Sequence, residues 1–327
     1  MNAKALELEH DIWSDWLLRR RLGSDPANER VVRPVIDRIA DRVLDGARLE
    51  PRMTLADVGS GDGLIAFRAI ERVGPSLRVH FADISAPLLR RAESLATDRG
   101  VRAQCTFQRS AAARLEHIAD ASVDVVTTRA VLAYVADKAG ALREFHRVLK
   151  PGGRISIGEP VFRDDALAVC ALKASLGGSP DAEDNEFLEL LHRFQASQYP
   201  ASPEAIANSP ITNYSERDLF GLVIQAGFAS VHLELHVDAA PSAVTDWNAF
   251  LASSPHPLAP SGSAILEALF SPEERRVFET RLRPRIESGG SLAIERVAYV
   301  TGVKPIPDGA AGRAAPIFQS GGDSRRG

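Results

Sequence analysis

Three glycines occupy alternate positions between an apolar run and a helix-like run, in the segment Leu55-Ala-Asp-Val-Gly-Ser-Gly-Asp-Gly-Leu-Ile65. Glycine is required where a backbone turns sharply and a ligand approaches it closely. The helix that follows such a turn presents unpaired N–H groups at its N-terminus. The segment therefore predicts a nucleotide-like ligand at the carboxyl end of a first buried strand.

The spacing of these glycines distinguishes two kinds of nucleotide site. The dinucleotide fingerprint is G-x-G-x-x-G, but its third glycine would fall on Leu64 here. The pattern is instead G-x-G-x-G, with Asp57 two residues before the first glycine. Asp83 lies 20 residues after the last glycine, at the end of the next apolar run, where a carboxylate accepts hydrogen bonds from both hydroxyls of a ribose. A nucleoside-containing ligand is expected, and a nicotinamide-dependent oxidoreductase is disfavoured.

The elements that position these residues alternate between strand-like and helix-like patterns. Apolar runs typical of buried strands cover residues 53–58, 77–82, 104–108, 123–127 and 154–158. Helical periodicity covers residues 64–73, 87–99 and 138–149. This alternation predicts an α/β fold in which a doubly wound parallel sheet has helices on both faces. Further along the chain we expect helices at 166–176, 185–196 and 215–226, strands at 231–237 and 292–303, and a loop at 197–210.

Four segments in chain order resemble the motifs of the class I S-adenosylmethionine-dependent methyltransferases. They are Ala56-Asp57-Val-Gly59-Ser-Gly61-Asp-Gly63, Phe81-Ala-Asp83-Ile-Ser85, Ser122-Val-Asp-Val-Val126 and Arg147-Val-Leu-Lys-Pro-Gly-Gly-Arg154. The resemblance covers roughly residues 51–160 and implies a Rossmann-like, seven-stranded, mostly parallel sheet with an antiparallel last strand. It also implies S-adenosyl-L-methionine as the cofactor and S-adenosyl-L-homocysteine as the product.

The resemblance assigns cofactor contacts position by position. The implied contacts to the methionine part are Asp57, Gly59, Ser60, Gly61, Thr128 and Arg129. Asp83 would bind the ribose, and Ile84 would pack on the adenine. Many members have a carboxylate after the third strand that meets the adenine amine. The matching run here is Arg109-Ser110-Ala111, so Ser110 replaces that carboxylate and Ala111 follows it.

Methyl transfer from a sulfonium depends on alignment and desolvation, and a base is needed only if the acceptor must lose a proton. The catalytic candidates are Tyr134 after the fourth strand, Glu159 after the fifth strand and His256 in a proline-flanked loop. Arg129 is a candidate partner for a carboxylate of the cofactor or the acceptor, and Glu159 is one for an acceptor ammonium. The alternative for each of these residues is that its side chain is hydrogen-bonded within the protein and has only a structural role. No His–Asp pair lies at the end of a motif, and this pattern favours a zwitterionic or soft nucleophile.

The N-terminal segment is predicted to form a helical lid. Trp13 and Trp16 have helical spacing and are expected to cover the ligand, with the arginines Arg19, Arg20 and Arg21 along its rim. Packing of both tryptophans on the core is the alternative. The predicted organisation is a cap at 1–50, a methyltransferase domain at 51–304 and a disordered tail at 305–327. Helical insertions near 163–214 and 241–288 are expected to shape the acceptor pocket.

The methyl acceptor is predicted less directly. The run from Thr127 to Tyr134, followed by Glu159-Pro160, is similar to a bacterial subgroup that includes arsenite- and methionine-methylating enzymes. Cys105 and Cys170 are too few for the usual arsenite arrangement. S-methylation of a thioether such as methionine is therefore the hypothesis. The alternatives are O- or N-methylation of a secondary metabolite and, in another class, a non-catalytic cofactor-binding scaffold.

Composition excludes several other classes of protein. The 327 residues include 39 basic and 43 acidic ones, giving a net charge of −4, so the basic excess of a nucleic-acid-binding protein is absent. No apolar run approaches the ~18 residues of a membrane span, and the N-terminus lacks the apolar centre of a signal peptide. We therefore expect a cytoplasmic enzyme with a small-molecule substrate and no metal site, acting as a monomer or homodimer.

Overall fold

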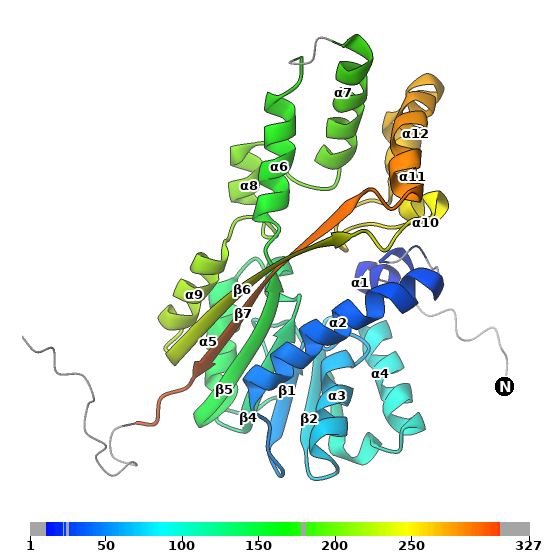
Figure 1. Cartoon of the computed structure of the whole chain (residues 1–327). Coiled ribbons are helices and arrows are strands. Elements are labelled where there is room, and N and C mark those ends of the chain that lie inside the picture. Colours follow the sequence, from blue (N-terminus) through cyan, green and yellow to red (C-terminus); the bar gives the residue numbers. More distant parts are fainter. Residues whose placement is uncertain (1–10, 22, 24–25, 178–180, 308–327) are drawn as a thin grey trace, which may run out of the picture.

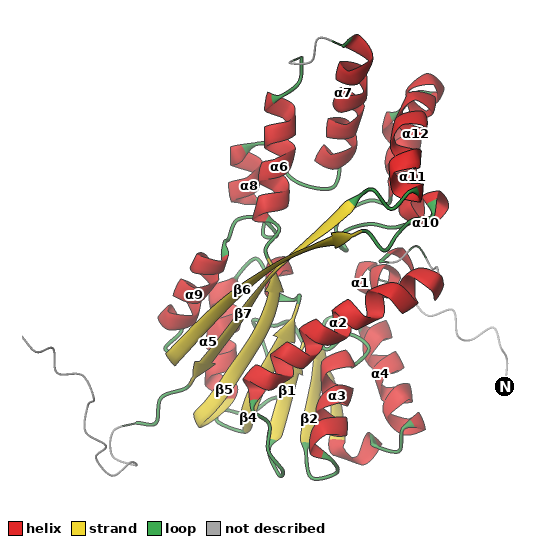
Figure 2. Cartoon of the chain, viewed as in Figure 1, coloured by secondary structure: helices red, strands yellow, loops and turns green. Residues whose placement is uncertain are grey.

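A computed structural model describes residues 11–21, 23, 26–177 and 181–307 of the chain. Its centre is a seven-stranded sheet with the strand order β3-β2-β1-β4-β5-β7-β6 (Figures 1 and 2). The strands are β1 (Thr54–Val58), β2 (Arg78–Asp83), β3 (Cys105–Arg109), β4 (Val123–Arg129), β5 (Leu149–Pro160), β6 (Ala229–Pro241) and β7 (Leu292–Val303). The first five strands pair in parallel, whereas β7 runs antiparallel to both β5 and β6. The predicted doubly wound, mostly parallel sheet with an antiparallel last strand is confirmed.

The strand order creates a switch point at β1, which pairs with β2 on one side and with β4 on the other. In open α/β sheets, ligands bind outside the carboxyl ends of the strands at such a point. The glycine turn leaves the carboxyl end of β1, Asp83 ends β2, and Arg129 ends β4. Residues from three separate motifs are therefore brought to one edge of the sheet.

Helices cover both faces of the sheet and enclose two apolar cores. On one face lie α2 (Pro26–Ala47), α3 (Leu64–Val73) and α4 (Ala86–Asp98); on the other lie α5 (Lys138–Val148) and α9 (Glu216–Gln225) (Figure 1). Side chains alternate between the faces of a strand. In β1, Leu55 accordingly belongs to the first core and Ala56 to the second. Both cores are continuous layers of buried aliphatic and phenylalanine side chains, which hold the strand ends in fixed positions.

Two groups of inserted helices pack together beyond the sheet (Figure 1). The first group is α6 (Arg163–Ala174), α7 (Ala182–Ala196) and α8 (Pro203–Asn208), and the second is α10 (Trp247–Ala252), α11 (Gly262–Leu269) and α12 (Pro272–Glu287). They share a third apolar core in which Phe187 and Phe194 of α7 meet Trp247 and Phe278. The loop predicted at 197–210 is wrong in part, because α8 lies within it. Ser202 caps this helix and proline occupies its first position, a known start signal.

The N-terminal segment contains two short helical turns before α2. They are α1 (Ile12–Asp15) and a π-helical turn, η2 (Trp16–Arg20). Asp11 caps α1, accepting a hydrogen bond from the backbone N–H of Ser14. Residues 1–10 and 308–327, which include most of the predicted tail, lie outside the described residues. Within the described part of the chain, every helix is too short or too polar to cross a membrane.

Candidate cofactor and acceptor site

The glycine turn after β1 brings the backbone to the surface of a large cavity. Gly59 and Gly61 have positive φ angles of 67° and 56°, which side-chain-bearing residues rarely adopt. A Cβ on Gly59 would lie 2.1 Å from Cγ2 of Val131, and one on Gly61 would lie 3.4 Å from Cδ2 of Leu17 in the N-terminal segment. The glycines therefore permit both the turn itself and the close approach of η2 above it.

The side chain of Asp57 lies at this cavity, and only one of its two carboxylate oxygens is hydrogen-bonded. Its Oδ1 accepts a hydrogen bond from Oγ1 of Thr127 at 2.9 Å, whereas its Oδ2 is buried and has no partner among the described residues. The neighbouring Ser60 hydroxyl is buried and unpartnered in the same way. Burial raises the pKa of Asp57 to about 7. A carboxylate in this state favours a cationic hydrogen-bond donor, such as the ammonium of the cofactor's methionine part.

The residues predicted to contact the nucleoside of the cofactor also line the cavity. Asp83 accepts hydrogen bonds from the backbone N–H groups of Gly61 and Ser85, both at 2.7 Å, and burial raises its pKa. A carboxylate has about four lone-pair positions, so Asp83 can still accept from ribose hydroxyls. Ile84 is 49% exposed and offers an apolar face. Ser110 and Ala111 lie in the same wall. The orphaned polar atoms and the glycine turn thus fit S-adenosylmethionine.

Two arginines face the cavity without partners. Arg129, at the end of β4, and Arg21, just after η2, make no side-chain hydrogen bond or ion pair with any described residue. Burial lowers the pKa of Arg129, and burial together with the charge of Arg129 lowers the pKa of Arg21 to about 9. Arg21 is the last of the three arginines predicted along the rim. The run itself does not reveal which of its members faces inward.

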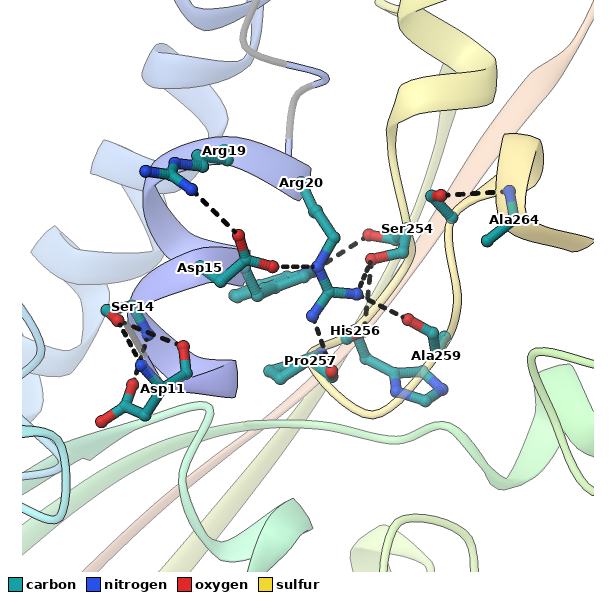
Figure 3. Close-up of polar contacts among 12 residues, drawn as sticks. Asp11, Ser14, Asp15, Arg19, Arg20, Ser254, His256, Pro257, Ala259 and Ala264 are labelled. Carbon is teal, nitrogen blue, oxygen red and sulfur yellow. Dashed lines mark hydrogen bonds and ion pairs between the residues drawn. The ribbon is translucent and has the colours of Figure 1, made fainter. Parts of the chain in front are cut away.

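The N-terminal segment covers the cavity, and Arg20 joins it to a second element. Trp13, Trp16 and Arg19 line the cavity, but Arg20 does not. Figure 3 shows the Arg20 guanidinium directed at the loop after α10, where it donates to Oγ of Ser254 and to the carbonyls of Pro257 and Ala259 at 2.8–3.2 Å. Arg20, predicted along the rim of the lid, uses these donors to hold the loop and does not itself line the cavity.

Two further hydrogen bonds strengthen this connection. Nε1 of Trp16 donates to the carbonyl of Ser254 at 3.0 Å, and the N–H of Ser254 donates to the carbonyl of Arg20 at 2.9 Å. The N-terminal segment and the loop at 253–260 therefore form one connected cover over the cavity. The sequence places these two segments more than 230 residues apart.

Four aromatic side chains form a continuous wall of the cavity, which we call the aromatic wall. Trp13 contacts Tyr134 edge-on with ring centroids 5.4 Å apart, and Phe162 lies between Tyr134 and Tyr199 at 6.3 and 6.1 Å. All four rings line the cavity. Burial raises the pKa of Tyr134, so its phenol stays protonated and is a hydrogen-bond donor rather than a base. Sequence reasoning missed Phe162 and Tyr199, although the position of Phe162 just after β5 was a usable signal.

His256 lies behind this wall. Its imidazole is 2% exposed and contacts the rings of Phe162 and Tyr199 at 5.5 and 5.3 Å. Its Nε2 donates to the carbonyl of Gln198 at 2.8 Å, which ties the two insertions together. His256 is not among the residues that line the cavity. Its Nδ1 is buried and has no hydrogen-bond partner among the described residues. The catalytic role of His256 stays a prediction that this position does not favour.

Glu159 is likewise a structural group. It is fully buried and accepts hydrogen bonds from the N–H groups of Val131 and Ala133 and from the hydroxyl of Thr128, all at 2.9–3.1 Å. Neither Glu159 nor Thr128 lines the cavity. This position does not favour the roles predicted for Glu159 at an acceptor ammonium and for Thr128 at the cofactor, and both roles stay predictions. The pair instead fixes the segment after β4 that carries Tyr134.

The whole cavity has a volume of about 1050 Å³. Sites for one small molecule usually measure roughly 300–1,000 Å³, so there is room for a cofactor and an acceptor together. The glycine turn, Asp83 and the aromatic wall all belong to the lining of this one cavity. Within the described residues, no group of three or more histidine, cysteine or acidic side chains is arranged to hold a metal ion.

Comparison with known proteins identifies the family. Residues 49–194 match the family model of a methyltransferase domain. A curated relative is 30% identical over 286 residues, which cover 81% of this chain and 90% of the relative. The chain belongs to the class I S-adenosylmethionine-dependent methyltransferases, and it is an enzyme whose cofactor is S-adenosylmethionine.

That relative is nocamycin O-methyltransferase from Saccharothrix syringae. A ubiquinone/menaquinone biosynthesis C-methyltransferase from Pseudomonas paraeruginosa is also 30% identical, over 58% of this chain and 69% of the relative. Among solved structures, the YcgJ protein from Bacillus subtilis aligns with a TM-score of 0.50 at 15% identity and covers 82% of this chain and 99% of that one. This structural likeness shows the fold alone.

Proposed function

We propose that this enzyme transfers a methyl group to an oxygen atom of a small molecule whose body is mainly apolar. The observation that carries the proposal is the wall formed by Trp13, Tyr134, Phe162 and Tyr199. Aromatic side chains provide large apolar contact areas with few polar handles. The relative that matches most of the chain is named as an O-methyltransferase, which supports oxygen as the acceptor atom.

The side chains around the cavity favour methionine less than an oxygen acceptor. Its ammonium needs an acidic partner, and the predicted one, Glu159, is buried and fully occupied. Cys105 and Cys170 lie outside the cavity lining, so chemistry through thiolates has no support there. Burial also raises the pKa of Cys105 to about 11, which keeps that thiol protonated.

The residues of the chain supply position and exclusion of water. S-adenosylmethionine, when bound, provides an electrophilic methyl on a sulfonium. Asp57, Ser60 and the glycine turn hold its methionine part, and Asp83 and Ile84 hold its nucleoside. The cover formed by the N-terminal segment and the loop at 253–260 keeps water from the site. Alignment and desolvation are the two effects that this reaction requires.

An acceptor screen tests the proposal. The purified enzyme with S-adenosylmethionine is offered apolar phenols, alcohols and carboxylic acids, together with thiols and methionine. S-adenosylhomocysteine and each methylated product are quantified by mass spectrometry, with Asp83→Ala as the control that lacks the ribose-binding carboxylate. We expect product from oxygen acceptors with apolar bodies. Formation of S-methylmethionine with no oxygen-methylated product would overturn the proposal.

A further inference from the structure

The two inward-facing arginines exceed what the cofactor needs. The cofactor carries one carboxylate, which requires one cationic partner. Arg129 lies two residues after Thr127, whose hydroxyl bonds Asp57 at the predicted methionine end. Arg129 is therefore the arginine placed to hold the cofactor carboxylate. Arg21 comes from the cover, stacks over the ring of Trp16 at 5.4 Å, and remains without an anionic partner.

The acidic residues around the cavity do not neutralise Arg21. Asp165 accepts a hydrogen bond from Arg296 at 3.1 Å, and Asp62 lies 3.6 Å from Nε of Arg91. Asp62 and Glu295 raise the pKa of Arg21 through their charges, but neither comes within ion-pair distance of its guanidinium. A partly exposed guanidinium that lines the cavity and has no ion-pair partner among the described residues is available to bind the anion of a ligand.

We propose that the acceptor is an organic acid and that Arg21 holds its carboxylate, which is the group that receives the methyl. This inference rests on the proposed O-methyl transfer and names its substrate class. Guanidinium and carboxylate form strong, charge-assisted hydrogen bonds, and the aromatic wall takes the apolar body of the acid. A single interaction with Arg21 leaves the second carboxylate oxygen free to react.

Methyl transfer to a carboxylate needs no base among the groups that line the cavity. A lone pair of the carboxylate oxygen forms the new O–C bond while the S–C bond breaks, and the electrons of that bond stay on sulfur. A carboxylate is already ionised at neutral pH, so no proton leaves, and Tyr134 and His256 need not act as bases. The charges of the sulfonium and the carboxylate cancel in this step, which leaves a neutral thioether and a neutral ester. The ester has lost its charge and is held less tightly by Arg21.

Binding measurements test this inference without turnover. The protein saturated with S-adenosylhomocysteine is titrated calorimetrically with three matched pairs: 2-naphthoate and 2-naphthamide, phenylacetate and phenylacetamide, and decanoate and decanamide. We expect the acids to bind about tenfold or more tightly than the amides. Arg21→Gln should remove this preference for acids, and Arg21→Lys should keep part of it. Arg129→Gln should instead lower the affinity for S-adenosylhomocysteine. Retained S-adenosylhomocysteine binding shows that the Arg21 variants are folded.

The product distinguishes this inference from the proposed function. Mild alkali hydrolyses a methyl ester to methanol and the acid, whereas a methyl ether resists it. Alkali-labile product from the acids supports the inference. Equal binding of acids and amides, or ethers as the only products, overturns the inference and leaves O-methyl transfer intact. Methylation of sulfur alone overturns the proposed function itself.

Discussion

Asp57 couples cofactor binding to pH. Its carboxyl is buried with one oxygen unpartnered, and burial raises its pKa to about 7. Below that pH the group is protonated and neutral, and an ammonium ligand gains little from it. Binding of the cation favours the ionised form, so affinity for S-adenosylhomocysteine should rise as pH increases toward 7 and level off above it. The limiting slope is about tenfold per pH unit.

Isothermal titration of S-adenosylhomocysteine between pH 5.5 and 8.5 measures this dependence. Asp57→Asn should bind weakly at every pH and show a flat profile through this range. Asp98→Asn, at an exposed aspartate in α4, is the matched control and should retain the wild-type profile. A profile that stays flat in the wild type would show that Asp57 does not meet the cofactor's ammonium.

Glu159 is predicted to matter for stability rather than for acceptor binding. Glu159→Ala leaves two backbone N–H groups and the Thr128 hydroxyl without their buried acceptor. We expect the free energy of unfolding to fall by about 3 kcal/mol or more. Thr128→Val removes only one hydrogen bond, and we expect a loss of about 1 kcal/mol. Urea unfolding measures both. A Glu159→Ala protein of normal stability that fails to bind acceptor would restore the predicted ammonium-binding role.

Individual residues could be predicted from the sequence where spacing defines their backbone position. Gly59, Gly61 and Asp83 follow from the glycine turn and the strand after it, and they line the cavity. The sequence did not indicate the buried positions of Glu159 and His256, because a polar residue at a strand end or in a loop does not reveal its hydrogen-bond partners. Only the fold shows that backbone groups use their polar atoms.

At the scale of elements, Arg20 holds the cover closed. Arg20→Met keeps most of the apolar stem but removes the donors to Ser254, Pro257 and Ala259. We expect S-adenosylhomocysteine to dissociate about tenfold faster, because the loss of several charged hydrogen bonds lowers the barrier to opening. Stopped-flow tryptophan fluorescence, using Trp13 and Trp16 as reporters, measures this rate.

Arg143→Met in α5 is the control for the cover, since the side chain of Arg143 is 64% exposed, pairs with Asp137 and lies outside the cavity lining. It should change the dissociation rate of S-adenosylhomocysteine by less than about threefold, as expected for an exposed ion pair. If Arg20→Met releases the ligand at the wild-type rate, the contacts in Figure 3 do not control opening.

The central helices and strands are close to their predicted bounds because strand and helix periodicities are strong in the buried sheet. The sequence pattern was less informative where tertiary pairing decides the conformation. The Lys-Pro-Gly-Gly run lies between the predicted helix at 138–149 and the predicted strand at 154–158. In the structure it belongs to β5, which begins at Leu149. Gly152 and Gly153 exchange backbone hydrogen bonds with Lys304, so the end of β7 recruits these residues into the sheet.

At the scale of the whole molecule, two cores hold the sheet and a third holds the insertions. The sheet carries the cofactor residues, whereas Phe162 and Tyr199 of the aromatic wall lie among the inserted segments. The sequence predicted both insertions but not that they pack on each other. Contacts between Phe187 and Phe278 join segments about 90 residues apart, and no periodicity within either segment reveals them.

This division predicts that the two halves of the site can be separated by mutation. Phe278 is fully buried, with its ring 5.1 Å from Phe194 and 5.4 Å from Phe270. Phe278→Ala should lower the free energy of unfolding of the part built on the third core by about 3–5 kcal/mol. We expect faster hydrogen exchange in α7 and α12 and loss of acceptor binding, while the affinity for S-adenosylhomocysteine changes by less than about threefold.

Phe145→Ala in α5 is the matched control, because this ring is equally buried but belongs to the core of the sheet. It should lower the stability of the whole domain and speed hydrogen exchange in the strands. The affinities for S-adenosylhomocysteine and for the acceptor should both fall. Hydrogen exchange and calorimetry on the two variants decide the question. If Phe278→Ala lowers the affinity for S-adenosylhomocysteine as much as Phe145→Ala does, the insertions and the sheet form one cooperative unit. The inserted helices then have no stability independent of the sheet.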